Sequence, residues 1–153
     1  MKYPIKIENI NSSVEFFDEI VPLIKESKEY LGRQKWCKGI HNGWLFTNIG
    51  YALNIFLYKI ENEQSPEDNL LWVMVGDIPS IYLDTYGIKS TKEVVENYIE
   101  LANDWIFHAE SGQSLDECFP LEAQNSSESI KMLKTRIQFI RDEMLQNISE
   151  DMM

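Results

Sequence analysis

The sequence feature that most restricts the possible folds is an apolar stretch at the centre of the chain, Leu70–Val75. Every residue in it is apolar, so it has no polar face that could lie against water. This pattern is typical of a strand in a sheet that is covered on both faces. The segment Gly76–Pro79 follows and ends the strand, because proline has no N–H to donate. We expect pairing to resume at Ile81–Leu83.

The length and composition predict one α+β domain over residues 1–153. A chain of 153 residues with 44% apolar and 12% aromatic residues can bury a core of its own and is not expected to be disordered. No repeat, linker or low-complexity tract divides it. We expect a small antiparallel sheet of about three or four strands.

A hairpin is predicted before the central strand. Gly43–Asn48 and Tyr51–Ile60 read as its strands, with the turn near Ile49-Gly50. Apolar side chains alternate on both faces of the second strand, so both faces need a cover. Helices from the N-terminal and C-terminal parts of the chain are expected to supply it.

Three helices are predicted from periodic apolar residues and terminal signals. The positions that set their bounds are the capping-box pairs Ser12/Glu15 and Ser90/Glu93, the helix-ending Gly112, and Asn125 or Ser127 at the start of the last helix. Pro22 lies inside the first helix and should kink it or divide it in two.

The sequence indicates a cytoplasmic protein. Two cysteines, Cys37 and Cys118, do not make a disulfide framework and fit a reducing compartment. Met1–Lys6 has no apolar core of a signal peptide. No apolar run approaches the ~18 residues of a membrane span.

The charge balance restricts the class of partner. The chain carries 25 acidic and 14 basic residues, for a net charge of −11. This disfavours nucleic acid and anionic membranes, which repel an acidic surface, and it suits a basic protein partner. Solubility alone also explains an acidic composition. The sequence does not indicate an oligomeric state.

The acidic residues are unevenly distributed. From Glu93 to Glu128 there are nine acidic residues and no lysine or arginine. A solvated helix normally mixes both signs, because opposite charges four residues apart stabilise it. We therefore predict a partner-binding surface here, extended by the acidic loop Glu61–Asp68. Its candidate residues are Glu93, Glu96, Glu100, Asp104, Asp116, Glu117, Glu63 and Glu67.

A segment expected to be a loop, Trp36–Trp44, holds the most reactive side chains. Cys37 and His41 have a C-x3-H spacing that invites a metal site. A structural zinc site usually needs four such ligands, and the only other candidates are His108 and Cys118. We therefore predict no metal and no cofactor, and interpret the tryptophans as core residues beside a turn.

Catalysis is the alternative use of this segment. Cys37 or His41 could act beside Asp77 as a nucleophile and base. No catalytic signature supports this, so no catalytic residue is predicted. A small cytosolic enzyme or adaptor of unknown substrate remains the alternative function.

The core Trp72-Val-x-Val-Gly-Asp-x-Pro79, with the capped helix ending near Trp105, Phe119-Pro120 and Ile137–Arg141, resembles a family of uncharacterised bacterial proteins over roughly residues 70–145. That resemblance implies no activity. The small size, acidity and lack of an active site are similar to immunity proteins of bacterial toxin systems, including contact-dependent growth inhibition. This likeness implies a non-enzymatic protein that binds and neutralises a basic toxin, such as a nuclease.

Overall fold

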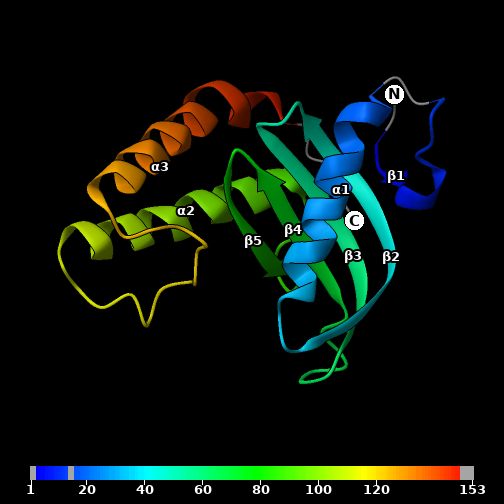
Figure 1. The fold of residues 1–153 in the computed structure, drawn as a ribbon, viewed down its shortest axis with the longest axis horizontal. Helices are drawn as coiled ribbons and strands as arrows, with labels where there is room; N and C mark the ends of the chain where they lie inside the picture. Colours follow the sequence, from blue (N-terminus) through cyan, green and yellow to red (C-terminus); the bar gives the residue numbers. More distant parts are fainter. Residues whose placement is uncertain (1–2, 14–15, 149–153) are drawn as a thin grey trace.

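The computed structural model describes residues 3–13 and 16–148 and confirms the α+β class (Figure 1). One antiparallel sheet has the strand order β1-β2-β3-β4-β5. Its strands are β1 Ile5–Lys6, β2 Cys37–Ile49, β3 Leu53–Asn62, β4 Leu70–Gly76 and β5 Ile78–Asp84. The helices are α1 Phe17–Gly32, α2 Thr91–Glu110 and α3 Ser127–Phe139, and a π-helical segment, Ile140–Met144, continues α3. None of the helices in the described residues is long and apolar enough to cross a membrane.

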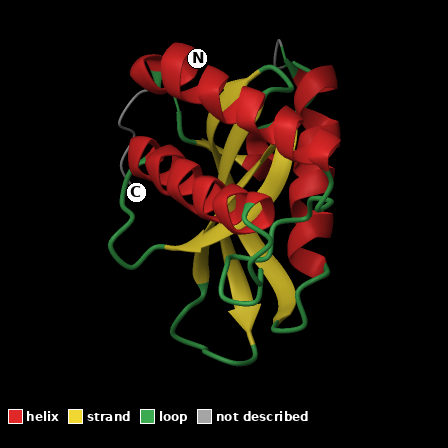
Figure 2. Ribbon diagram, turned by 90° about the vertical axis from the view of Figure 1, so that its left-hand side faces the viewer, coloured by secondary structure: helices red, strands yellow, loops and turns green. Residues whose placement is uncertain are grey.

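The sheet lies between two layers of helix (Figure 2). Side chains of β4 alternate between the layers, and five successive residues of this strand, Leu71–Val75, are at most 3% exposed. Trp72 and Met74 join the core that includes α2 and α3, whereas Leu71, Val73 and Val75 join the core beneath α1. The prediction of a central strand covered on both faces is therefore confirmed.

The sheet has five strands, rather than the three or four expected. The two-residue β1 is too short to leave a periodic signal, and it pairs Ile5 with Leu45 at one edge. At the other edge β5 begins at Ile78, earlier than the expected Ile81. Pro79 is tolerated there because an edge strand has one side without pairing partners. A register shift between Met74 and Gly76 accommodates the break.

The expectation of a loop at Trp36–Trp44 is wrong, because β2 already begins at Cys37. Register shifts interrupt its pairing with β3 between Cys37 and Gly39, between Ile40 and Asn42, and again near Thr47. Each bulge adds an unpaired residue and breaks the two-residue alternation by which a strand is recognised in sequence. The segment therefore forms a strand although its sequence lacks a regular alternation of apolar and polar residues.

The helix ends follow the capping signals only in part. Ser90 Oγ accepts the Glu93 N–H at 3.3 Å at the start of α2, as predicted. Ser126, rather than Asn125 or Ser127, caps α3. Helix α1 is one element through Pro22 and begins at Phe17. The expected capping partner Glu15 lies outside the described residues.

Gly76 is expected to be irreplaceable at the end of β4. Its φ is +154°, and a Cβ there would lie 2.3 Å from the carbonyl oxygen of Ala52. Because the obstacle is backbone, Gly76→Ala should lower the free energy of unfolding by about 1–3 kcal/mol. Urea denaturation measures the change. Gly39→Ala is the control, since nothing lies within 4 Å of its Cβ position. Equal effects of the two substitutions would contradict the steric argument.

Candidate functional site

Three carboxylates form a line along the exposed face of α2, which we call the α2 acidic stripe: Glu96, Glu100 and Asp104. They recur every four residues, so they lie one turn apart on the same face. The opposite face is apolar and buried in the core, which fixes this one toward solvent. Among the described residues, no lysine or arginine pairs with the stripe.

Phe107 is an exposed apolar side chain near the end of the α2 acidic stripe. It follows Asp104 by three residues, and it is 58% exposed although it is aromatic. The two preceding residues, Trp105 and Ile106, are buried in the core. The prediction from sequence missed Phe107. Its spacing from Asp104 and Glu100, which places it on their face of the helix, was the signal that could have found it.

The other predicted partner residues have different surroundings. Glu93 takes part in the cap of α2, where Ser90 Oγ lies 3.3 Å from its carboxylate. Asp116 and Glu117 are exposed in the loop after α2. Glu63 pairs with Lys38 at 3.2 Å, and Glu67 is exposed in the β3–β4 loop.

These residues do not form one continuous surface. Figure 1 shows the β3–β4 loop at the bottom of the sheet, whereas the C-terminal half of α2 and the loop after it lie at the left. The structure therefore separates Glu63 and Glu67 from the α2 acidic stripe. It brings the segment with Asp116 and Glu117 toward the stripe, because Cys118 lies close to Asp104.

Part of the acidic excess is neutralised by cations from distant segments. Lys134 of α3 pairs with Glu110 at 2.8 Å. Arg33, which follows α1, donates to both carboxylate oxygens of Glu122, at 2.7 and 2.9 Å. None of the ion pairs between described residues joins a lysine or arginine to the stripe, and the same holds for Asp116 and Glu117 in the loop after α2.

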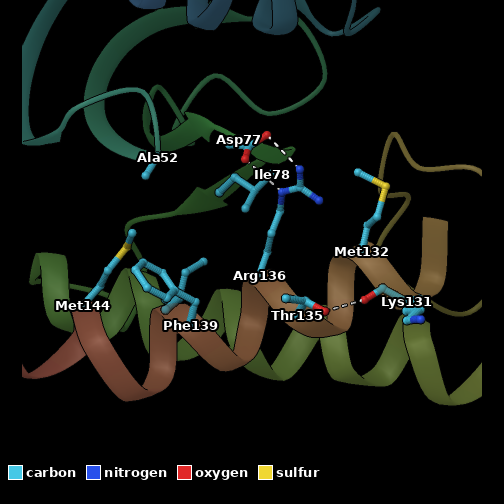
Figure 3. Close-up of a pocket in the computed structure, with 10 residues that line it drawn as sticks. Ala52, Asp77, Ile78, Lys131, Met132, Thr135, Arg136, Phe139 and Met144 are labelled. Carbon is cyan, nitrogen blue, oxygen red and sulfur yellow. Dashed lines mark hydrogen bonds and ion pairs between the residues drawn. The ribbon is translucent and has the colours of Figure 1, made fainter. Parts of the chain in front are cut away.

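A second surface feature is an open apolar groove of about 540 Å³ between α3 and the turn that joins β4 to β5 (Figure 3). Met132 and Phe139 line it and are 46% and 53% exposed. Arg136 crosses it to Asp77, with Nε 3.0 Å from Oδ2 and Nη2 donating to Oδ1 at 3.2 Å. Asp77 is therefore held in an ion pair with Arg136.

The residues of the enzymatic alternative are not brought together. Cys37 pairs with Asn62 at one end of β3, whereas Asp77 follows Gly76, which pairs with Leu53 at the other end. At ~3.3 Å per residue, these ends are about 30 Å apart. Burial also raises the pKa of the Cys37 thiol, which disfavours a nucleophilic thiolate.

Another group of potential ligands does converge. A ring nitrogen of His108, a carboxylate oxygen of Asp104 and Sγ of Cys118 lie within 4.8 Å of one another, the one such group of three among the described residues. Burial and the neighbouring Asp104 carboxylate raise the pKa of the Cys118 thiol. His108 and Cys118 were considered as partners for Cys37 and His41, but they meet Asp104 instead.

Comparison with known proteins adds a family but no activity. Residues 33–151 match a family described as "Domain of unknown function (DUF4826)". The matched range begins just after α1 and contains β2–β5, α2 and α3. No curated protein and no solved structure gives a significant match.

Proposed function

Since the chain belongs to the DUF4826 family, whose description assigns no activity, we propose a function from its surface. We propose that it is an immunity-type protein that binds and neutralises a basic bacterial toxin domain, such as a nuclease. The observation that carries the proposal is the α2 acidic stripe with Phe107 exposed beside it. The protein acts by binding and not as an enzyme.

Electrostatics supports a basic partner. Like charges four residues apart destabilise a helix by about 0.2–0.5 kcal/mol per pair, and the stripe contains two such pairs. Lysines or arginines of a docked partner would remove this repulsion. A net charge of −11 would also attract a basic domain from a distance and speed its association.

Affinity would come mainly from the apolar contact. Rim charges guide association and set partner choice, whereas a few buried aromatic side chains usually supply most of the binding energy. Phe107 is the exposed aromatic residue that lies next to the stripe. A toxin whose substrate is anionic exposes basic groups around its active site, and the stripe would cover those groups.

The test reverses two charges of the stripe. Glu96→Lys/Glu100→Lys should lower the affinity for the partner at least about tenfold, because it places like charges across the interface. Asp104 is left unchanged to keep its contacts with His108 and Cys118. The tagged protein is first used to capture partners from its host lysate at low salt, and mass spectrometry identifies them. Affinities are then measured with the purified partner.

The matched control reverses two exposed acidic residues elsewhere, Glu61→Lys/Asp142→Lys. Both pairs change the net charge by four, from −11 to −7, so only the position of the change differs. The control should retain most of the affinity. Equal weakening by both pairs would refute docking at the stripe, and capture of no basic, toxin-like chain would refute the proposed function.

A further inference from the structure

A group of three metal-binding side chains lies where α2 meets the loop that follows it. Asp104 and His108 are four residues apart on α2, so they share one face of the helix. Cys118 comes from the loop, where its N–H donates to the carbonyl of Leu115 at 3.1 Å. The three ligand atoms lie within 4.8 Å of one another. The spacing on α2 accounts for Asp104 and His108, but neither sequence position nor the docking proposal accounts for Cys118 beside them.

We propose that Asp104, His108 and Cys118 bind a divalent transition-metal ion of the Zn²⁺ type, with water in the fourth position. Thiolate, imidazole and carboxylate are the three side-chain ligands that zinc takes in proteins. Zinc is usually four-coordinate, so three protein ligands leave one position for water.

The spacing of the donor atoms can be compared with that of a tetrahedral metal site. With zinc–ligand bonds of about 2.0–2.3 Å, neighbouring donor atoms lie about 3.3–3.6 Å apart. Asp104 Oδ1 and His108 Nδ1 are 3.5 Å apart. Cys118 Sγ, at most 4.8 Å from both ligand atoms, needs to approach by about 1 Å. Nδ1 also lies 2.8 Å from the Asp104 carbonyl oxygen, a contact that binding through Nδ1 would exchange for a bond to the metal.

Exposure and charge also suit a divalent cation. The Asp104 side chain is 52% exposed and that of His108 is 22% exposed, so an ion and a water ligand can reach them. Cys118 is 8% exposed and anchors the site in the core. A bound metal would displace the proton of the Cys118 thiol, and the resulting thiolate and the Asp104 carboxylate together match a charge of +2. The chain from Glu93 to Glu128 contains no lysine or arginine that could take the place of the metal.

Cobalt(II) is the probe for this site. The full chain, stripped of metal by a chelator, is titrated with Co²⁺ and followed by absorption spectroscopy. We expect a thiolate-to-cobalt charge-transfer band and intense visible bands of tetrahedral cobalt that saturate at one ion per chain. Zn²⁺ added in equal amount should abolish both. Absence of a saturable charge-transfer band would overturn the proposal.

Substitutions assign the ligands. Cys118→Ser should lose the charge-transfer band, and the matched control Cys37→Ser should keep it. Asp104→Asn changes an exposed side chain, so it tests the site without disturbing the core. It should lower Zn²⁺ affinity at least about tenfold, because even groups that only support a ligand contribute 10–100-fold. A band that survives Cys118→Ser, or unchanged affinity in both Asp104→Asn and His108→Asn, would refute this site.

Discussion

Trp72→Ala is expected to lower the free energy of unfolding by about 3–5 kcal/mol, the range for removing a buried aromatic side chain. Trp72 lies in the middle of β4 and is 0% exposed. Its ring meets Phe46 edge to face, with centroids 5.0 Å apart. Its Nε1–H donates to the carbonyl of Ile88 at 2.8 Å, which ties the segment before α2 to the sheet. The substitution therefore removes packing and a hydrogen bond at once.

Urea denaturation followed by far-ultraviolet circular dichroism measures this loss. Trp72→Phe keeps an aromatic ring but not the hydrogen bond to Ile88, so its effect should be smaller. Tyr86→Ala is the surface control, since Tyr86 is 89% exposed and its removal should change stability by less than about 0.5 kcal/mol. A loss below about 1 kcal/mol for Trp72→Ala would contradict the central role of this residue.

The free energy of unfolding is expected to fall steeply with pH in the alkaline range. Burial raises the pKa of Tyr30, Tyr58 and Tyr98 well above the usual range. Their contribution to stability is complete below pH ~10, where tyrosines of the unfolded chain also keep their protons. Above that pH the unfolded chain loses protons that the folded protein retains. Stability should then fall by about 1.4 kcal/mol per pH unit for each tyrosine, or about 4 kcal/mol for the three.

The slope of stability against pH between about pH 10 and 11 tests this linkage. Tyr58 shares a buried hydrogen bond with Ser27, so Tyr58→Phe is made together with Ser27→Ala to leave no polar atom unpaired. This double variant should show a slope smaller by up to about 1.4 kcal/mol per pH unit, the contribution of one tyrosine. Tyr86→Phe, at an exposed position, should leave the slope unchanged. Equal slopes in all three proteins would show that the buried tyrosines do not govern alkaline unfolding.

The sequence predicted the elements whose signals are local. Leu70–Val75 is apolar throughout, and Ser90/Glu93 has the spacing of a capping box, so β4 and the start of α2 were found correctly. The full extents of β2 and β5 were missed. Bulges break the alternation in β2, and the irregular ladder around Gly76 hides where β5 starts. Both depend on pairing partners that no local pattern specifies.

For the candidate sites too, the sequence predicted what depends on local spacing and missed what depends on contacts between distant segments. The sequence shows that no lysine or arginine lies between Glu93 and Glu128, but not that Arg33 and Lys134 reach this region from other elements. The four-residue spacing of Asp104 and His108 is visible on a predicted helix. The position of Cys118 beside them depends on how the loop returns to α2, which spacing alone does not determine.

The order of the strands in the sheet also affects how the chain finds its fold. From β2 to β5, neighbours in the sequence are neighbours in the sheet, and the segments that join them are short. Each pairing therefore closes a small loop and gives up little conformational entropy before its contacts form. Among the strands of the described residues, only the pairing of β1 with β2 spans a long segment, which contains α1. Most of the sheet can thus assemble hairpin by hairpin, a topology that favours rapid folding.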